Sequence, residues 1–482
     1  MVANSPPWRG GSQRLTGWLV LNYFKNLWHR EGGYRELLVT AFPLILSTAS
    51  WSVLQFIDRV FLTWYSPEAV AASMPAGILN FTLVSLFLGT AAYSGTFVAQ
   101  YYGAEKFHKI GETLWHGIYI SLIGGLVIFF IGFMAEPIFR MIGHGPEVEK
   151  LEAEYFKILC FGSIGPVVSS VFAAFYTGRG QNKPVMWVNF VSLGINTLLA
   201  YILIFGKFGA PQLGIKGAAI ATIIAGAAPI LIYGYFIFGT SHNIKYKTLS
   251  GFKFNKELFG RMLKFGLPSG VHFFIEIAGF TTFLLILGRI GMIELAATNI
   301  AFNINTIAFM PMIGIGIAIS MLTGQNIGRG RVDIAERFVW QGFQICFIYM
   351  GSIALTYFFL PNIYIYAFEV NADPAEFIAI KNFAIVLLKF VAVYSIFDTL
   401  NLVFASAIKG AGDTKFVMLI GLLLSLFVLV IPAYIVLVVM QRGLYDAWLI
   451  ASIYISLMGF SYLARFLTGK WKSMKVIEHS YI

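Results

Sequence analysis

Three carboxylates stand inside long apolar segments of this 482-residue chain, namely Asp58, Glu276 and Asp398. A charged side chain at the centre of a bilayer costs about 2.5–3.5 kcal/mol on insertion scales, so such residues normally face a cavity or a partner. Burial raises the pKa of a carboxyl group and a nearby cation lowers it, so one group can exchange a proton or a sodium ion as its surroundings change. The three residues therefore suggest reversible binding of a small cation inside a membrane.

Polar neighbours at helical spacing extend two of these candidate sites. Tyr394 precedes Asp398 by four residues and Asn401 follows it by three, which brings a phenol, a carboxylate and an amide near one helical face. His272 lies one turn before Glu276, where it either acts as a polar partner or simply packs. Because no Lys or Arg lies three or four residues from Glu276, we expect no ion pair within that helix.

The acid in the first half of the chain has different neighbours. Arg59 follows Asp58 directly, and successive side chains on a helix point about 100° apart. Asp58 is therefore a candidate site residue, with a structural ion pair as the alternative. Asn189 and Asn196 lie seven residues apart, two turns along one face of a later segment, where helix–helix hydrogen bonding is an equally good interpretation.

The elements that carry these residues are predicted to be membrane helices. The chain is 58% hydrophobic and 12% charged, with a mean hydropathy of +0.76, whereas soluble proteins contain about 25% charged residues. The apolar runs are about twenty residues long and do not alternate, which predicts an all-α protein and not a barrel. We expect twelve spans, at about 37–64, 70–99, 114–134, 152–176, 184–206, 214–239, 262–288, 295–324, 338–360, 380–408, 416–440 and 447–467.

An internal duplication relates the two halves of the chain. A shift of 225 residues matches the first two spans to the seventh and eighth without a gap, and a shift of 232 matches the ends of the fourth and tenth. Parallel repeats of this kind are found in transporters, whose substrate site lies between the halves. The matched pairs include Pro43 with Pro268, Asn80 with Asn305, Gln100 with Gln325, Gly103 with Gly328, and Gly178 with Gly410.

A polar stretch at about 240–261 separates the two halves. We therefore predict an N-lobe at 36–240, a linker at 241–261 and a C-lobe at 262–468, followed by a cytoplasmic tail at 469–482. Residues 1–35 suit either a helix in the membrane interface or a poorly ordered tail. Lys and Arg residues on the face of the termini outnumber those on the opposite face by 24 to 6. This excess predicts a multi-pass protein of the cytoplasmic (inner) membrane with both termini in the cytoplasm.

Other classes of protein have little support. The two cysteines, Cys160 and Cys346, lie in apolar spans, and no GxxxxGK[ST], HExxH or paired Cys/His motif occurs. We therefore predict neither an enzyme nor a cofactor, and no metal beyond a Na⁺ ion at Glu276 and Asp398. The net charge of +11 is explained by membrane topology, so we expect no nucleic-acid partner.

Several stretches together resemble the multidrug and toxic compound extrusion (MATE) family of transporters, over about residues 35–470. Glu276 in the seventh span and Asp398 in the tenth look like the NorM-type branch. The resemblance implies two six-helix lobes in a V that alternate access, and export of cationic drugs in exchange for Na⁺ or H⁺. The stretches are Phe56–Leu62 with Ala71–Ala72, Gln100–Gly103, Leu267–Gly270, Ala296–Ala301, Thr323–Gly328 and Lys409–Thr414.

The resemblance also implies roles for individual residues. In the C-lobe, Glu276 and Asp398 would bind the coupling ion, with Tyr394 near them. In the N-lobe, Asp58 matches the family's acid in the first span, and Asn196 matches an asparagine that supports it.

The chain departs from the family pattern at two positions of the N-lobe. Arg59 stands where a small or neutral residue is usual, and Ala200 stands where related members often carry a second Asn. The resemblance therefore favours the C-lobe site.

We predict a secondary antiporter that exports organic, mostly cationic and amphipathic compounds in exchange for Na⁺ or H⁺, as a monomer in the lipid bilayer. One alternative is a flippase or exporter of a lipid-linked precursor or a specific metabolite. Such a cargo is anionic and needs a basic cavity, for which Arg59, Lys157 and Lys389 are candidates. Another alternative is a membrane module without transport, such as a receptor or scaffold.

Overall fold

The computed structural model describes residues 28–369 and 374–478, so most of the predicted interfacial segment 1–35 lies outside the described residues. The described residues are helical and contain no strand. Eleven helices are long and apolar enough to cross a membrane, and one further pair, bent by 40°, forms a twelfth span. The prediction of an all-α membrane protein with twelve spans is thus confirmed.

The first half contains six spans and a short linker. The fourth span is the bent one, and the break lies at Ser163 between α7 and α8. The elements are α2 (Tyr34–Tyr65), α3 (Pro67–Ala92) continued by α4 (Ser94–Gly103), α5 (His108–Ile131) with η1 (Gly132–Met134) and α6 (Ala135–Ile142), α7 (Pro146–Gly162) with α8 (Ile164–Thr177), α9 (Asn182–Phe205), α10 (Ile215–Ile237), α11 (Thr240–Tyr246) and η2 (Ser250–Phe252).

The second half repeats this order. The fifth span of this half, which is the eleventh of the protein, widens into π turns on both sides of Pro432. The ring of this proline removes a backbone donor from the helix. The elements are α12 (Lys256–Leu287), α13 (Met292–Gly328), α14 (Val332–Phe359), α15 (Pro361–Glu369), α16 (Pro374–Ala411), α17 (Thr414–Leu424) with η3 (Ser425–Val430), α18 (Ile431–Tyr434) and η4 (Ile435–Val439), α19 (Leu444–Leu467) and η5 (Lys470–Ser473).

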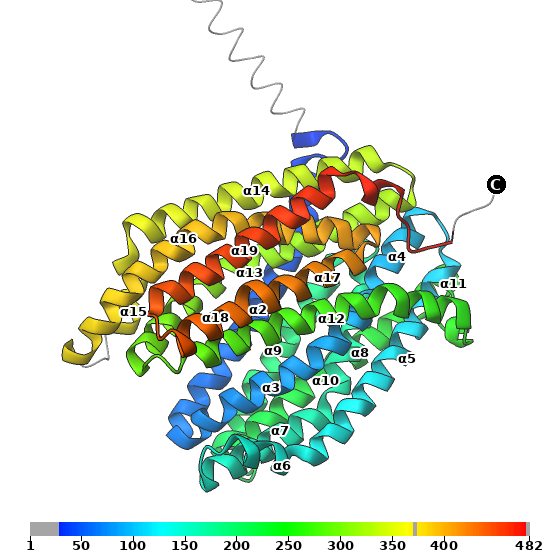
Figure 1. Cartoon of the computed structure of the whole chain (residues 1–482). Helices are drawn as coiled ribbons and strands as arrows, with labels where there is room; N and C mark the ends of the chain where they lie inside the picture. Colours follow the sequence, from blue (N-terminus) through cyan, green and yellow to red (C-terminus); the bar gives the residue numbers. More distant parts are fainter. Residues whose placement is uncertain (1–27, 370–373, 479–482) are drawn as a thin grey trace, which may run out of the picture.

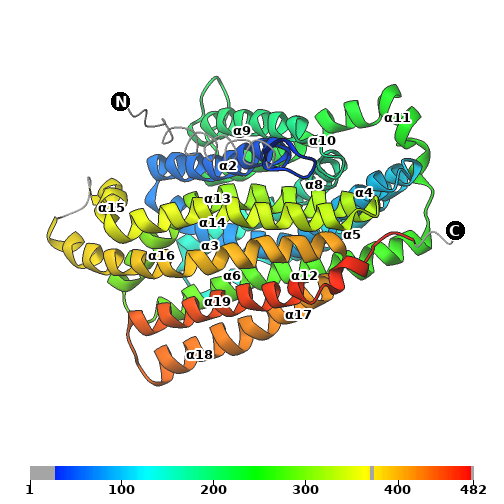
Figure 2. The same cartoon turned by 90° about the horizontal axis from the view of Figure 1, so that it is seen from above.

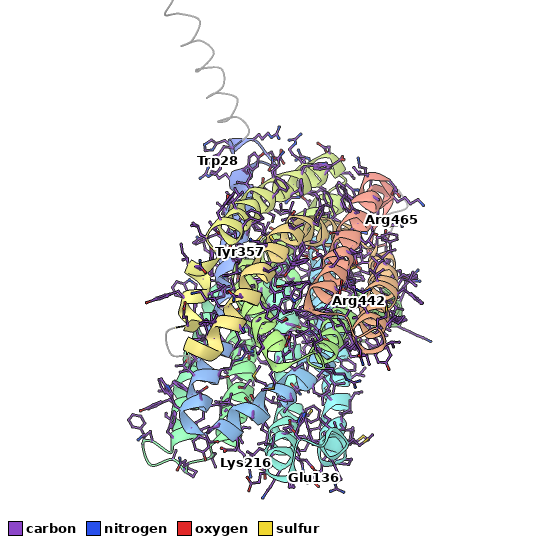
Figure 3. The ribbon with its side chains drawn as sticks, turned by 60° about the vertical axis from the view of Figure 1, so that its left-hand side comes forward. Trp28, Glu136, Lys216, Tyr357, Arg442 and Arg465 are labelled. Carbon is purple, nitrogen blue, oxygen red and sulfur yellow. The ribbon has the colours of Figure 1, made fainter. Side chains whose placement is uncertain are left out.

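Buried apolar side chains form two separate cores, one in each half. Figure 1 shows the helices of the second half lying over those of the first, and Figure 3 shows Tyr357 in one bundle and Glu136 in the other. The cores exchange short segments at one end, because Leu37 of α2 belongs to the second core and Met262 of α12 belongs to the first. The two lobes are therefore joined by the first turns of their own leading helices.

A seam runs between the lobes, where α2 packs on α13 and α3 packs on α12. Figure 2 shows α2 lying between α9 and α13. At one end of the seam the backbones touch. A Cβ on Gly103 would lie 2.0 Å from the Gln325 carbonyl oxygen, and a Cβ on the matched Gly328 would lie 2.2 Å from that of Gln100. Only glycine fits this approach, which the duplication repeats on both sides of the seam.

We call this end of the molecule the terminal face, because both ends of the described chain lie on it. Glu31, near the first described residue, pairs with Arg331 beside the end of α13, and Glu478 pairs with Arg261 near the start of α12. The linker between α10 and α12 lies on the same face.

Candidate cation site

Glu276 lies on α12 with its side chain 38% exposed, one turn after a buried histidine. His272 Nδ1 is 3.5 Å from Glu276 Oε2, and on its other side His272 Nε2 is 3.2 Å from the hydroxyl of Tyr462. That hydroxyl donates to the Val417 carbonyl oxygen at 3.2 Å. His272 is thus the polar partner of Glu276 within this helix, and the contact would be an ion pair only with a protonated imidazole.

A second cation lies near Glu276 and was not predicted. Lys409, in the last turn of α16, is close enough for its charge to act on Glu276 and His272. In the described part of the chain Lys409 has no ion-pair partner. The predicted span ends at residue 408 and leaves Lys409 outside the membrane, whereas α16 continues to Ala411.

Asp398 lies on α16 in the polar cluster that its neighbours predicted. Its side chain is buried, and Asn401 Nδ2 donates to its Oδ1 at 3.1 Å. Tyr394, one turn earlier and also buried, accepts a hydrogen bond from Asn305 Nδ2 of α13 at 3.3 Å. The predicted grouping on one helical face is present, and Asn305 joins it from a second helix.

Sequence reasoning missed Asn305 as a site residue, although the duplication carried a signal for it. The matched Asn80 of α3 makes a similar bridge in the first lobe, where its Nδ2 lies 3.4 Å from Cys160 Sγ and 3.3 Å from Ser163 Oγ. In each lobe an asparagine thus connects the second span of that lobe (α3 or α13) to its fourth span (α7 or α16). Only in the second lobe does its partner belong to the carboxylate cluster.

Glu276 of α12 and Asp398 of α16 are near enough for the charge of Glu276 to act on Asp398, and for both charges to act on Tyr454 of α19. Asn305 Oδ1 is buried and lacks a hydrogen-bond partner among the described residues. Carboxylate and amide oxygens are ligands that hard cations prefer, and an unpaired buried oxygen suits either a bound ion or a proton. No group of three or more His, Cys, Asp or Glu residues suited to a metal occurs in the described chain.

Asp58 forms a separate, smaller site in the first lobe. Its Oδ2 accepts a hydrogen bond from Thr222 of α10 at 3.4 Å, while its Oδ1 is buried without a partner. Asn196 of α9 lies beside it, fully buried, but its amide atoms complete no hydrogen bond of standard geometry. Arg59 is exposed and makes no ion pair with Asp58 in the described structure, so the alternative of a neighbouring ion pair is not supported.

Asn189 does not join this site. Its Nδ2 donates to Ser47 Oγ of α2, so it ties two helices together, as the alternative interpretation proposed. Ser47 and Asp58 are eleven residues apart on α2, or about 16 Å along the helix axis. Asn189 and Asn196 therefore share a helix but serve different contacts.

The terminal face is closed by hydrogen bonds that cross the seam. Gln100 Nε2 donates to the Gly410 carbonyl oxygen at 3.1 Å, and the matched Gln325 Nε2 donates to that of Gly178 at 2.8 Å. Tyr93 donates to the carbonyl oxygen of Lys409 at 2.7 Å, which ties this closure to a residue near Glu276. Gly410 lies about 18 Å along the axis of α16 from Asp398, so one helix connects the closure to the carboxylate.

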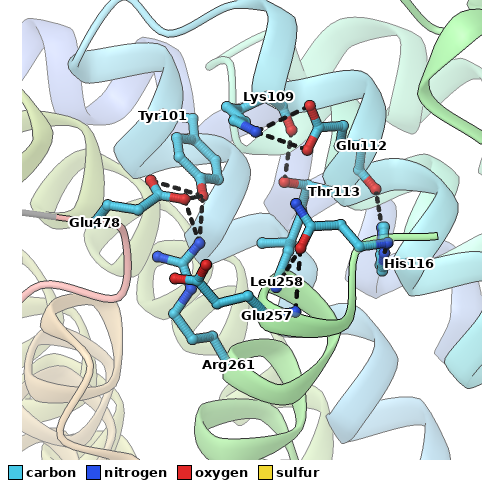
Figure 4. A network of polar contacts seen from close by, with 10 residues as sticks. Tyr101, Lys109, Glu112, Thr113, His116, Glu257, Leu258, Arg261 and Glu478 are labelled. Carbon is cyan, nitrogen blue, oxygen red and sulfur yellow. Dashed lines mark hydrogen bonds and ion pairs between the residues drawn. The ribbon is translucent and has the colours of Figure 1, made fainter. Parts of the chain in front are cut away.

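The C-terminal segment adds a contact that the duplication does not repeat. Val476 N donates to Gln100 Oε1 at 2.9 Å, and Tyr101 donates to Glu478 at 3.0 Å (Figure 4). Arg261 also binds the Glu478 carboxylate. Partial burial is the largest single influence on Glu478 and raises its pKa, but the hydrogen bonds from Arg261, Tyr101 and the backbone, together with the charge of Arg261, outweigh it and hold that pKa below its usual value. We call these five residues the C-terminal latch.

The MatE family model matches residues 43–202 and 268–436, which is more than half of the chain. The chain belongs to the MatE family. The two matches begin at Pro43 and Pro268, the pair at which the internal duplication also begins. The resemblance noted in the sequence is confirmed, and with it the expectation of a transporter and not an enzyme.

Relatives of this MatE protein cover nearly its whole length. It is 26% identical over 453 residues to the probable multidrug resistance protein NorM of Thermotoga maritima, covering 93% of this chain and 95% of the relative. It is 27% identical to the multidrug resistance protein NorM of Burkholderia vietnamiensis, covering 79% and 82%.

Solved structures share its fold. A MOP superfamily transporter from Pyrococcus furiosus matches with a TM-score of 0.82 at 20% identity, over 93% of this chain and 98% of the other. An outward-facing multidrug resistance MATE transporter of the same superfamily matches with a TM-score of 0.81 at 20% identity and the same coverage. At this identity the likeness establishes the two-lobe fold of this MatE protein and no more.

Proposed function

We propose that this MatE protein is a multidrug efflux antiporter of the MOP superfamily. It exports amphipathic organic cations from the cytoplasm in exchange for Na⁺ or H⁺, acting as a monomer in the inner membrane. The observation that carries this proposal is the joint site of Glu276 and Asp398 inside an apolar lobe. Full-length similarity to proteins named as multidrug resistance proteins supports the class of cargo.

The terminal face is the cytoplasmic face in this proposal. The excess of Lys and Arg on that face supports the orientation. The N-lobe is residues 36–240, the C-lobe is residues 262–468, and residues 241–261 link them. Since the hydrogen bonds of Gln100 and Gln325 close the lobes at this face, they must break before cargo enters from the cytoplasm.

Coupling takes place in the C-lobe. Glu276 and Asp398 exchange the incoming ion, Asn401 holds Asp398 in place, Tyr394 lies one turn from Asp398 and is held by Asn305, and His272 partners Glu276. Entry of one positive charge down a membrane potential releases about 2.3 kcal/mol per 100 mV, which can drive cargo outward.

In the N-lobe, Asp58 and Asn196 form a second cation site that acts separately. Asn189 contributes only to packing. This division of roles rests on the contacts of each residue, since Asn189 bonds to Ser47 whereas Asn196 lies beside Asp58.

Efflux from proteoliposomes tests the proposal. A cationic dye is loaded, and a Na⁺ gradient or a pH gradient is imposed in turn, with Glu276→Gln, Asp398→Asn and the exposed control Glu147→Gln. We expect one gradient to drive efflux in the wild type and in the control, and both site variants to lose at least about tenfold, because each removes a charge-assisted contact worth about 1.5–3 kcal/mol. Near wild-type efflux from both site variants would refute the assigned roles.

One observation favours a second candidate function, export of an anionic metabolite or lipid-linked precursor. Lys409 brings an unpaired cation to the carboxylate site, where an anionic cargo group could bind it. An anionic dye tested in parallel separates the two functions. Loss of anion efflux in Lys409→Gln, with cation efflux absent in the wild type, would favour this alternative.

A further inference from the structure

The linker between the lobes carries an exposed surface that lies outside the carboxylate sites and the closed seam. We call it the linker patch and define it by four lysines and four apolar side chains. The apolar members are all more than half exposed, from 51% at Leu249 to 76% at Ile244. The members are Ile244, Lys245, Lys247, Leu249, Phe252, Lys253, Phe254 and Lys256.

The patch is held firmly against α5 by backbone contacts. Trp115 Nε1 donates to the Thr248 carbonyl oxygen at 2.6 Å, and the backbone N of Asn255 donates to His116 Nε2 at 2.8 Å. Gly111 permits the close approach, since a Cβ there would lie 2.5 Å from the Tyr246 carbonyl oxygen. The exposure of the patch is therefore a fixed property of the fold.

Two aromatic neighbours on α5 indicate the position of the patch relative to a lipid bilayer. Trp115 binds the linker backbone, and Tyr119 one turn further donates to the Phe252 carbonyl oxygen. Tryptophan and tyrosine are enriched where a membrane span meets the headgroup layer. Trp115 and Tyr119 therefore favour a position of the patch at the headgroup layer of a bilayer.

The lysines of the patch lack acidic partners, whereas some cations elsewhere on the terminal face have them. In the described chain, none of the four lysines of the patch makes an ion pair. On the second lobe, Arg331 pairs with Glu31 and Lys472 pairs with Glu336. The described linker therefore gathers four lysines without acidic partners on one exposed surface.

A hollow of about 510 Å³ opens beside the patch. Lys253 and Lys256 line it together with Lys109, which is already paired with Glu112 at 2.9 Å (Figure 4). Glu257 also lines it, so the hollow keeps a small positive excess. The hollow is shallow and open to the surroundings, so it can receive a headgroup but does not enclose a ligand.

We propose that the linker patch and this hollow bind the headgroup phosphate of an anionic phospholipid in the leaflet at the terminal face. Lys253 and Lys256 neutralise the phosphate, and Phe252 and Phe254 lie among the acyl chains. A soluble phosphate would satisfy the lysines but would leave both phenylalanines in water. Membrane lipid is the one occupant that matches the charged and the apolar members together.

Titration of the detergent-solubilised full chain with phosphatidylglycerol, followed by native mass spectrometry, tests this proposal. The decisive variant is Lys253→Gln/Lys256→Gln. The matched control is Lys183→Gln/Lys415→Gln, which removes the same charge from two exposed lysines that the duplication pairs on the same face. Since a basic residue near an anionic surface contributes about fivefold in affinity, we expect about thirtyfold weaker binding of phosphatidylglycerol for the first pair and no change for the second.

Two further arms separate the source of the phosphate. Phosphatidylcholine should bind weakly to every variant, and inorganic phosphate should not displace phosphatidylglycerol. Phe252→Ser/Phe254→Ser should weaken both lipids, because acyl contacts do not depend on headgroup charge. Equal weakening in the two lysine pairs, or displacement by inorganic phosphate, would overturn the proposal, and the melting temperature of each variant in phosphatidylcholine confirms that it is folded.

Discussion

The two lobes share one helical plan but place their charges at different positions. The shift of 225 residues that matches their packing residues lays Glu276 on Trp51 and lays Asp58 on the fully buried Phe283. Glycines and glutamines at the seam are kept in both copies, because backbone contact there leaves no room for change. Packing has thus preserved the symmetry, while the carboxylates that suggest function break it.

The two carboxylate sites also differ in their surroundings. Among the described residues the partners of Asp58 are the neutral Thr222 and Asn196, whereas Glu276 contacts His272, feels the charge of Lys409 and acts by its own charge on Asp398. A site with several interacting charges can change its ion occupancy when one neighbour moves. We therefore infer that the C-lobe site is the one that responds to opening of the seam.

The largest expected effect separates these two sites directly. We predict that Asp398→Asn lowers ion-driven efflux roughly ten- to hundredfold. The substitution removes the charge that accepts the hydrogen bond from Asn401 and that interacts with the charge of Glu276. A hydrogen bond to a charged group contributes about 1.5–3 kcal/mol, which corresponds to this range. Asp58→Asn should cause a smaller loss, because Asn can replace the single hydrogen bond from Thr222. Initial rates of dye efflux compare the variants, and a larger loss for Asp58→Asn would reverse the ranking of the lobes.

The next prediction concerns the shared seam, where the lobes should behave alike. Gly103→Ala and Gly328→Ala each push a methyl group against a carbonyl oxygen at about 2 Å, so each should destabilise the closed terminal face by about 1–3 kcal/mol. Distances between spin labels on the two lobes would report a shift toward a face that is open. Gly351→Ala, which meets nothing within 4 Å, is the control. Opening by only one of the two variants would show that the seam is not symmetric.

Much of this plan was predictable from sequence. Long apolar runs predict the spans because a bilayer requires internally bonded backbone, and the duplication predicts which spans are equivalent. Asn401 was correctly expected beside Asp398, because a spacing of three residues fixes a contact within one helix. Local spacing therefore predicts contacts along a helix well.

Contacts between different helices could not be predicted from the sequence. Asn305 reaches Tyr394 only because α13 packs on α16, and no spacing encodes that rotation. Lys409 was assigned to the surface, because its helix continues three residues past the predicted end of the span. Val476 and Ile477 were assigned to a tail, yet both are buried against the first lobe. Each miss comes from an element boundary or from packing between distant segments.

A smaller effect on transport is expected at Trp51, the residue that the duplication matches to Glu276. Trp51 lies 5.3 Å from Phe81, which lies 6.0 Å from Phe273 on the helix of Glu276, measured between ring centroids. Loss of a ring facing an organic cation costs about 0.5–2 kcal/mol. We therefore expect Trp51→Ala to raise the KM for an aromatic cation by roughly two- to thirtyfold, with kcat little changed. An unchanged KM would mean that this aromatic row serves packing alone, and Trp51→Phe should retain most of the affinity.

The smallest effect concerns the C-terminal latch, which has no counterpart at the matched Gln325. The pKa of Glu478 is lower in the folded protein than in an unfolded chain, where it is about 4.3. The bonds of its carboxylate with Arg261 and Tyr101 therefore stabilise the latch fully at pH values above about 4.3. This stabilisation is lost as the pH falls through the lowered pKa. Because the ion pair of Glu478 with Arg261 is partly exposed, its contribution to stability should be below about 1 kcal/mol.

Hydrogen exchange at the amide of Val476, which binds Gln100, measures this effect. After correction for intrinsic exchange, the protection of this amide should be constant near neutral pH and should fall only in acid. Glu478→Gln should remove that acid step and lower protection slightly at pH 7, whereas Glu147→Gln should do neither. Loss of protection between pH 5 and 8 in the wild type would contradict the lowered pKa, and would point to a group other than Glu478 as the one that releases the latch.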